Sequence, residues 1–331
     1  MTQNASPDAM ASQVPAWRRA LIYGLLALFA GWCALAFRRD IAQIDLTPLK
    51  SGWMAVVAAG ALSLWNYVLR VVRWRLYLKQ LGHVLPWRFV SLTFMSGFAF
   101  TLSPGKVGEV VRGRYYLPHG ISLASVTGAF FVERLLDLLA MIVLASAVLA
   151  ELHQYQFFLW AALALVGGLL AGVALVPWQD VSARLARQPH GALLKLVQKV
   201  ANMLASARQF LSPGVLLMGL ALGLAAWAAE AIGLKLVADV VVPDLMSIPA
   251  AMGVYSIAII VGALSFLPGG LGSTETVMAA LLVTHGYSTP QAILLTLVCR
   301  LLTLWLAVLI GWVCVWLLRD ENNKAVQARY V

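Results

Sequence analysis

The chain has 331 residues, of which 61% are hydrophobic and only 11% are charged. A soluble domain carries about 25% charged residues, so this composition excludes an ordinary soluble protein and indicates an all-α polytopic membrane protein. The net charge of +10 would suggest nucleic acid in a soluble protein. Here we assign it to cytoplasmic loops, where Lys and Arg collect, and expect no nucleic-acid partner.

The N-terminal region is divided between a polar tail and an apolar run. Residues 1–16 are small and polar and are expected to form a disordered cytoplasmic tail. The run 20–37 follows Trp17-Arg18-Arg19 and is near the lower limit of ~17 residues for a span. We interpret it as an uncleaved anchor helix, and a cleaved signal sequence is the alternative.

A second apolar run, 53–69, ends in a cluster of cations. Arg73-Trp74-Arg75 places cations beside an aromatic ring, which is typical of anchoring at a cytoplasmic membrane boundary. The cluster consists of Arg70, Arg73, Arg75 and Lys79.

The next apolar run, 89–103, is too short to cross a bilayer. At ~1.5 Å per residue it reaches roughly 22 Å, whereas the hydrocarbon core is ~30 Å thick. It leads into a turn containing Pro104, Gly105 and Gly108, and then into an arm with Glu109 and Arg112. We predict a re-entrant helical hairpin, whose irregular backbone must be covered by protein or water.

The middle of the chain contains two spans and a basic segment. The spans are 123–149 and 157–176, and the first carries Glu133, Arg134 and Asp137. The segment 181–210 has cations spaced along a partly apolar stretch. We expect one or two amphipathic helices on the cytoplasmic face, with an anionic-lipid-binding patch as the functional alternative.

The C-terminal part repeats the order span, hairpin, span. A span over 215–237 contains Glu230. The second predicted hairpin runs over 250–286, around a turn containing Pro268, Gly269, Gly270 and Gly272. A last span over 292–318 precedes a cytoplasmic tail, 319–331.

The two halves share motifs at matching positions. Glu109 aligns with Glu275 and Arg134 with Arg300 without a gap, and each pair brackets a His-Gly dipeptide. The positive-inside rule places both termini in the cytoplasm and makes the first hairpin enter from that side and the second from outside. We therefore predict one transmembrane domain, 17–318, with about six full spans. Its two hairpins belong to an inverted repeat, 53–149 and 215–318.

These motifs also resemble a known family. The residues are Arg73-Trp74, Pro104-Gly105-x-x-Gly108-Glu109-x-x-Arg112, Glu133-Arg134-x-x-Asp137 and Pro268-Gly269-Gly270-Leu271-Gly272-x-x-Glu275. Over roughly 62–316 the chain resembles the lysylphosphatidylglycerol synthase/flippase transmembrane family. The resemblance implies an inner-membrane domain linked to moving lipids between leaflets. Because the sequence ends at Val331, we expect no aminoacyl-transfer domain and do not carry over the synthase activity.

The charged residues inside the membrane are the candidate site. Each costs about 2.5–3.5 kcal/mol to insert, so such residues face the interior and pair. In the repeat, Glu109 and Arg134 of one half correspond to Glu275 and Arg300 of the other. The simplest hypothesis pairs the carboxylate on each hairpin arm with a buried Arg, either within a half or across the halves. The candidate substrate-binding residues are Lys106, Glu109, Arg112, Glu133, Arg134, Asp137, Glu275 and Arg300.

Two interpretations of these charges remain open. In one, the ion pairs only hold the hairpins in place. In the other, Arg112, Arg134 and Arg300, together with helix ends at the two turns, receive an anionic lipid headgroup. Because the first half carries more charge, it is the expected entrance. Asn66 and Glu230 are expected to form helix–helix hydrogen bonds, and most of the 12 Trp residues to be interfacial anchors.

The sequence thus favours a flippase-like transporter of a lipid or lipid-linked precursor in a bacterial inner membrane. The alternatives are an enzyme, or an enzyme's membrane subunit, that modifies lipid headgroups, and a scaffold protein. We expect no enzymatic activity, because no nucleophile–base pair is evident. No cofactor or metal is expected either, because the sequence has no C-x-x-C pair and no Cys/His cluster. Homo-oligomerisation is left open.

Overall fold

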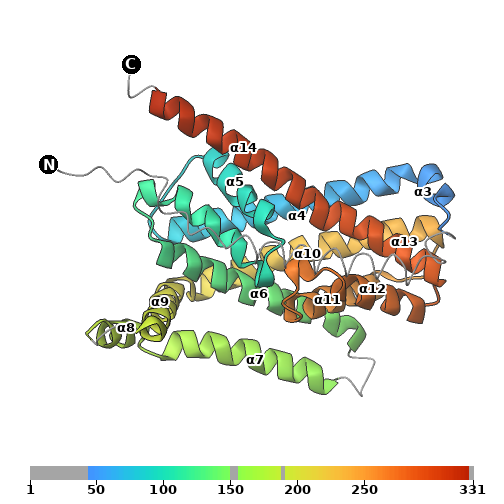
Figure 1. The fold of residues 1–331 in the computed structure, drawn as a ribbon. Coiled ribbons are helices and arrows are strands. Elements are labelled where there is room, and N and C mark those ends of the chain that lie inside the picture. Colours follow the sequence, from blue (N-terminus) through green and yellow to red (C-terminus); the bar gives the residue numbers. More distant parts are fainter. Residues whose placement is uncertain (1–43, 150–155, 188–190, 328–331) are drawn as a thin grey trace. The chain divides into compact units, whose positions relative to one another are not determined.

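A computed structural model of the chain describes residues 44–149, 156–187 and 191–327. From Asp45 onward these residues form one compact unit. Within the described ranges the regular structure is helical and contains no strand (Figure 1). This confirms the all-α class, while the predicted tail 1–16 and the apolar run 20–37 lie outside the described residues.

Long helices are joined by short helices and 3₁₀ turns. The first half contains α3 (Thr47–Ser51), α4 (Trp53–Gln80), α5 (Trp87–Ser96), η2 (Gly97–Phe100), η3 (Pro104–Tyr115), η4 (Leu117–His119) and α6 (Leu123–Leu149). The middle contains α7 (Gln156–Leu175), α8 (Trp178–Ala186), α9 (Ala192–Ala207) and η6 (Arg208–Phe210). The second half contains α10 (Pro213–Val241), α11 (Ile248–Leu264), η7 (Pro268–Gly270), α12 (Ser273–Thr284), α13 (Thr289–Arg300), η8 (Leu301–Trp305) and α14 (Leu306–Gln327).

Three helices of the described residues are long and apolar enough to cross a membrane. They are α4, α10 and the stretch from Thr289 to Arg319, and α7 with α8 makes a fourth if this pair, bent by 65°, counts as one span. Helix α6 has 27 residues and is long enough to cross. It is not among these spans, because Glu133, Arg134 and Asp137 make it too polar. The multi-pass character is supported, and the count of six spans stays a prediction.

The first predicted hairpin is present, but its second arm is not an α-helix. Helix α5 and η2 lead to a bend, and the chain returns as the 12-residue 3₁₀ helix η3. Such long 3₁₀ runs are uncommon and often mark a functional hinge or strain. The turn is tightly packed, because a Cβ on Gly108 would lie only 2.7 Å from the Phe100 carbonyl oxygen.

The second hairpin has two α-helical arms, α11 and α12, joined by η7. Its turn uses the left-handed backbone at Gly269, Gly270 and Gly272, where φ is 62°, 67° and 84°. The first hairpin also has a left-handed residue, but there it is Lys106, with φ 57°. Lys106 and Gly270 both stand two residues after the Pro of their turn, so the two turns share a backbone device.

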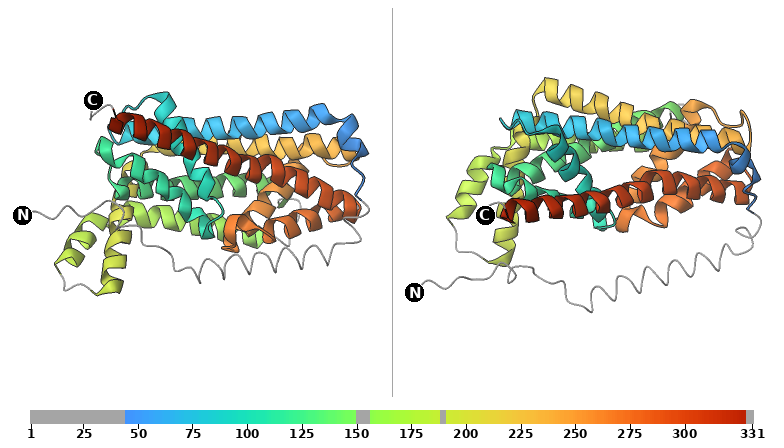
Figure 2. Two further views of the ribbon diagram at one scale, coloured as in Figure 1. Left: turned by 45° about the horizontal axis from the view of Figure 1, so that its top comes forward. Right: turned by 90° about the horizontal axis from the view of Figure 1, so that it is seen from above.

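The halves pack against each other reciprocally. Helices α4 and α10 run side by side (Figure 2). The first hairpin, through α5 and η2, packs on α14, which ends the second half, and α11 of the second hairpin packs on α6, which ends the first. The tips meet as well: η3 contacts η7, and a Cβ on Gly269 would lie 2.7 Å from a Leu102 methyl carbon.

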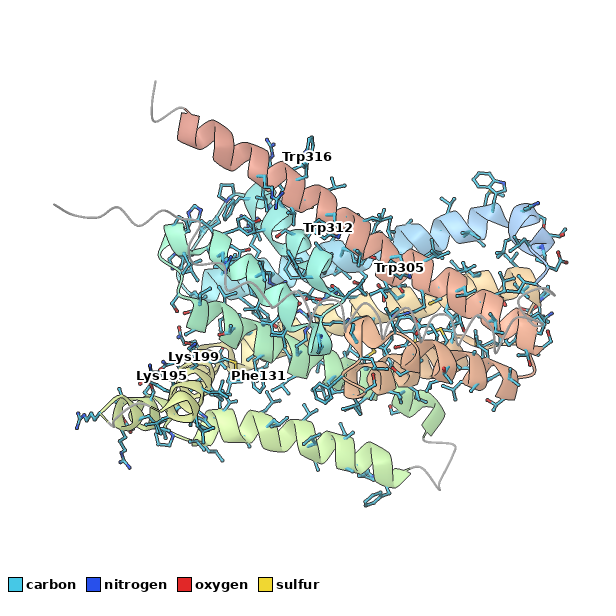
Figure 3. All side chains as sticks on the ribbon, viewed as in Figure 1. Phe131, Lys195, Lys199, Trp305, Trp312 and Trp316 are labelled. Carbon is cyan, nitrogen blue, oxygen red and sulfur yellow. The ribbon has the colours of Figure 1, made fainter. Side chains whose placement is uncertain are left out.

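The basic segment forms two short helices, in agreement with the prediction of one or two helices over 181–210. Helices α8 and α9 pack on each other, and α9 contacts α6, where Gly128 lies close to the backbone of Ala207. Lys195 and Lys199 project from the exposed part of α9 (Figure 3). The segment is therefore attached to α6 at one end and exposes its cations at the other.

The tryptophans fall into two groups. Trp305 at the end of η8 and Trp312 and Trp316 of α14 are exposed (Figure 3), as expected for residues that face lipid or the interface. Trp74 and Trp227 are buried. The interpretation of Trp74 as an interfacial anchor is therefore wrong, because α4 continues to Gln80 and turns this ring into the protein core.

Candidate functional site

Charged residues from three elements converge on two carboxylates of α6. Arg112 of η3 lies 2.8 Å from Glu133, and Arg73 of α4 lies 2.7 Å from Asp137 and 3.2 Å from Glu133. Trp227 of α10 donates its indole N–H to Asp137 at 3.1 Å. We call this group the arginine cluster: Arg70, Arg73, Arg112, Arg134, Glu133 and Asp137.

The pairing within the cluster differs from the prediction. Arg134 pairs with its own helix neighbours, Glu133 and Asp137, each at 3.0 Å. Glu109 instead accepts a hydrogen bond from Thr101 at 2.9 Å, and no ion pair joins it to Arg134 among the described residues. The reason is geometric, because Arg134 reaches two carboxylates on its own helix face.

Arg112 is enclosed by aromatic rings. Its guanidinium lies 3.9 Å from the Trp74 ring centroid and 4.4 Å from that of Phe94, and the side chain is buried. Trp74 is fixed in turn by the hydrogen bond from its N–H to the Tyr116 hydroxyl, 2.9 Å long. Arg112 therefore joins η3 to α4 and α6 from within the packed core.

The second half contains the predicted pair. The Arg300 Nε lies 2.6 Å from a Glu275 oxygen, and Arg300 Nη2 donates to the Gly269 carbonyl at 2.7 Å. Glu275 also accepts the Gly272 N–H at 2.6 Å. Arg300 and Glu275 thus brace both sides of the second turn, and this N–H at the start of α12 is already satisfied by the protein.

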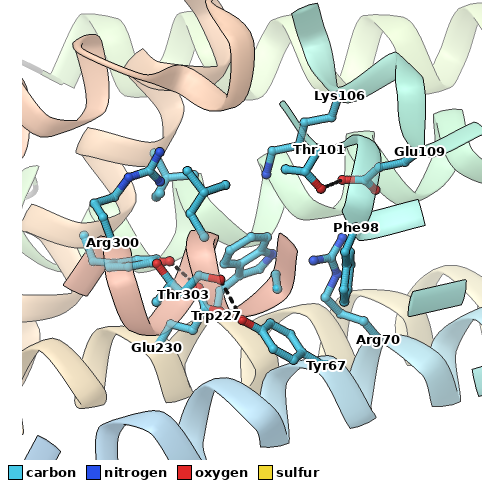
Figure 4. Close-up of a pocket in the computed structure, with 14 residues that line it drawn as sticks. Tyr67, Arg70, Phe98, Thr101, Lys106, Glu109, Trp227, Glu230, Arg300 and Thr303 are labelled. Carbon is cyan, nitrogen blue, oxygen red and sulfur yellow. Dashed lines mark hydrogen bonds between the residues drawn. The ribbon is translucent and has the colours of Figure 1, made fainter. Parts of the chain in front are cut away.

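A small cavity lies where the two hairpins and α4, α10 and α13 come together (Figure 4). We call it the junction cavity. Its volume is about 40 Å³, which is enough for about three water molecules. Its lining is Tyr67, Arg70, Phe98, Thr101, Lys106, Glu109, Trp227, Glu230, Tyr255, Ile259, Arg300, Thr303, Leu304 and Ala307.

Only part of the predicted set lines this cavity. Lys106, Glu109 and Arg300 do so (Figure 4), and the turn Pro104-Gly105 carries Lys106 to it. The remaining candidates hold the elements around it: Arg112, Glu133, Arg134 and Asp137 in the arginine cluster, and Glu275 at the second turn.

Arg70 and Arg73 belong to the site, although the sequence pattern had indicated a membrane boundary for them. Both are buried, and they share one face of α4 with Trp74 and Tyr77, while Lys79 is exposed. The spacing of Arg70, Arg73 and Tyr77 follows the helical period and marks an inward face. That periodicity is the signal that would have separated these two cations from their neighbours.

Arg70 has the most distant carboxylate partner of the four guanidinium groups in the arginine cluster. Its nearest carboxylate, Glu133, is 3.6 Å away, beyond hydrogen-bonding distance. Its Nε and Nη2 are buried and donate no hydrogen bond within the described part of the chain. The group lies instead over the rings of Phe98 and Trp227, at 5.2 Å and 5.6 Å from their centroids, which leaves its donors available.

The predicted helix–helix hydrogen bonds are confirmed. Asn66 of α4 donates to the Ala226 carbonyl of α10 at 2.8 Å. Tyr255 of α11 donates to Glu230 of α10, and Glu230 also lines the junction cavity. Tyr67 of α4 donates to the Thr303 carbonyl at 2.6 Å, in the π-helical segment η8 that follows Arg300.

Comparison with known sequences places this geometry in a family. The family described as the lysylphosphatidylglycerol synthase TM region matches residues 18–311. The chain belongs to this family. A curated relative, a UPF0104 membrane protein of Methanothermobacter thermautotrophicus, is 27% identical over 287 residues, which cover 78% of this chain and 82% of the relative. The family match includes both hairpins and all the residues of the arginine cluster and the junction cavity.

Proposed function

We propose that this protein is a flippase-like transporter that moves a lipid with an anionic headgroup between the leaflets of a bacterial inner membrane. The observation that carries the proposal is the junction cavity, a small buried space at the tips of two broken helical hairpins. It is lined by three cations and two carboxylates. Ionisable groups at membrane depth are expensive and typically mark a substrate or ion path.

The reciprocal packing supports the inverted repeat on which this proposal depends. Contacts of α5 with α14 and of α11 with α6, around the pair α4 and α10, are those expected of two halves related by a two-fold axis. In transporters with inverted repeats, substrates bind near the midplane where discontinuous helices meet. We propose that both termini and the α8–α9 segment lie in the cytoplasm, so that the two hairpins enter from opposite sides.

Transport requires the cavity to open. A space of about 40 Å³ takes a group of a few heavy atoms and excludes a whole phospholipid headgroup. We infer that this conformation is occluded and that the contact of η3 with η7 separates on one side at a time. The sequence has no G-x-x-x-x-G-K-[ST] motif, so we propose an ion gradient, the membrane potential or downhill lipid flow as the driving force.

The test is lipid movement in reconstituted vesicles. Purified full-length protein is placed in liposomes that contain fluorescent phosphatidylglycerol or fluorescent phosphatidylcholine, and an impermeant reductant bleaches the outer leaflet. We expect the protein to increase the fraction of phosphatidylglycerol that becomes bleached, with less effect on the zwitterionic lipid.

Protein-free vesicles and vesicles with heat-denatured protein are the controls. Folded protein that moves neither lipid faster than the protein-free vesicles, with and without an imposed proton gradient or potential, would contradict the proposal. Equal movement of both lipids would retain transport and remove the anionic preference.

A further inference from the structure

Lys106 is a cation without a close ionic partner that is held at the junction cavity by an unfavourable backbone. Its side chain lines the cavity (Figure 4), and within the described residues it has no hydrogen bond and no ion pair within 4 Å. Its φ of 57° is a left-handed conformation that non-glycine residues adopt at a cost of about 1–3 kcal/mol. The matching residue of the other turn, Gly270, adopts it freely, so Lys106 is a costly residue for a purely structural role.

Arg70 lines the same cavity and is a second cation whose hydrogen-bond donors lack partners. Only 6% of Arg70 is exposed, and its Nε and Nη2 have no hydrogen-bond partner in the described residues. A buried donor without a partner costs about 1–3 kcal/mol or more when charged. Arg70 and the partly buried Lys106 both line one cavity, which indicates that an acceptor belongs between them.

The formal charges specify the sign of that acceptor. The arginine cluster, the cavity and the second turn together hold six cations and five carboxylates. One negative charge therefore neutralises the buried set. Arg300, the third cation of the cavity, is already paired with Glu275, which leaves Lys106 and Arg70 as the free donors.

We propose that the junction cavity is a phosphate-binding site in which Lys106 and Arg70 hold the oxygens of one phosphate group. This inference rests on the proposed function and names the headgroup chemistry that the transporter recognises. The planar guanidinium of Arg70 offers two parallel N–H donors to phosphate oxygens, and the Lys106 ammonium adds a point charge. The volume of the cavity matches a group of a few atoms, so it suits the phosphate alone and not the whole headgroup.

The test measures binding apart from transport. Purified full-length protein is kept in a maltoside detergent, which contains no phosphate. It is titrated with inorganic phosphate, with short-chain phosphatidylglycerol, or with short-chain diacylglycerol as the neutral control. A ligand at free concentration c that binds only the folded state stabilises it by RT ln(1 + c/Kd) and so raises the unfolding temperature, and calorimetry gives Kd directly. We expect phosphatidylglycerol to bind and diacylglycerol not to bind. If inorganic phosphate binds as well, the phosphate group alone is sufficient for recognition. If phosphatidylglycerol binds and inorganic phosphate does not, the site recognises the phosphate only as part of a lipid.

The decisive variant is Lys106→Gly, because Gly suits the left-handed backbone and keeps the turn intact. We expect its unfolding temperature without ligand to equal or exceed that of the wild type, while its affinity for the phosphate probe falls about ten- to a hundredfold, the loss expected for one charge-assisted contact. Lys106→Met and Arg70→Lys test the contribution of each cation to this affinity independently. Lys199→Met, which removes an exposed cation of α9, is the matched control.

Wild-type affinity in Lys106→Gly and Lys106→Met would overturn the site, as would equal losses in Lys199→Met or no binding of any phosphate probe. The proposed function is tested separately. Lipid movement that persists unchanged in folded Lys106→Gly would leave transport standing and remove this site. Phosphate binding without lipid movement would retain the site and remove the transport function.

Discussion

At the scale of single residues, the buried charges divide into those that hold the fold and those that face the cavity. Glu133 is the centre of the first group, because its two oxygens lie within 2.8–3.6 Å of four guanidinium groups. Lys106 belongs to the second group. Pairing rather than charge makes the difference, since removing one partner of a buried ion pair is strongly destabilising, whereas a cation without a close partner keeps its donors for a ligand.

Replacing Glu133 by Gln should destabilise the protein strongly. Four arginines would then share Asp137 alone, and breaking a buried ion pair costs about 3–5 kcal/mol. We expect a large fall in the unfolding temperature and in the yield of monodisperse protein in detergent, measured by thermal unfolding and size exclusion. Asp180→Asn on the exposed surface of α8 is the control and should change neither. A Glu133→Gln variant as stable as the control would show that the cluster contributes nothing to folding.

At the scale of elements, the two hairpins reach the same place by different backbones. The first returns as the 3₁₀ helix η3 and the second as the α-helix α12. Arg300 and Glu275 brace the second turn through hydrogen bonds to its backbone, whereas the first turn depends on close packing around Gly108. The first hairpin is therefore the one in which the size of a single side chain decides the geometry.

Replacing Gly108 by Ala should distort the first hairpin. The new methyl would lie 2.7 Å from the Phe100 carbonyl and 2.8 Å from the Ser103 hydroxyl, and such overpacking costs about 1–3 kcal/mol. We expect a lower unfolding temperature and reduced lipid movement. The matched control is Gly167→Ala in α7, where a Cβ would meet no atom of another described element within 4 Å. It should be neutral or stabilising by roughly 0.5–1 kcal/mol. Equal behaviour of the two variants would refute the close approach.

At the scale of the whole molecule, the proposed inverted repeat makes a topological prediction. In a variant whose native cysteines are replaced by Ser, a new Cys at Lys199 of α9 should react with an impermeant maleimide only after the cells are permeabilised. A Cys at Asp244, in the loop after α10, should react in intact cells. The physical reason is the charge bias, since the cations of the α8–α9 segment favour the cytoplasmic side. Labelling of both positions from one side would exclude opposed hairpins.

The sequence by itself determined the membrane class, the two broken hairpins and the presence of an Arg partner for a hairpin carboxylate. These features depend on composition and local chemistry: hydropathy sets the class, and a Pro followed closely by several Gly favours a turn over a continuous helix. The shared spacing of Glu and Arg in the two halves indicated that such pairs exist, and the structure shows one in Glu275 with Arg300.

Only the tertiary structure decided which charges face the cavity. Arg70 had been assigned to a boundary and Arg112 to the substrate, yet Arg70 lines the cavity and Arg112 lies inside an aromatic cage. The partner of an ionisable side chain depends on which helix packs beside it and on the rotamer it takes there. The reciprocal packing of the halves brings Lys106 from the first hairpin and Arg70 from α4 to one small space, and no local pattern in the chain specifies that meeting.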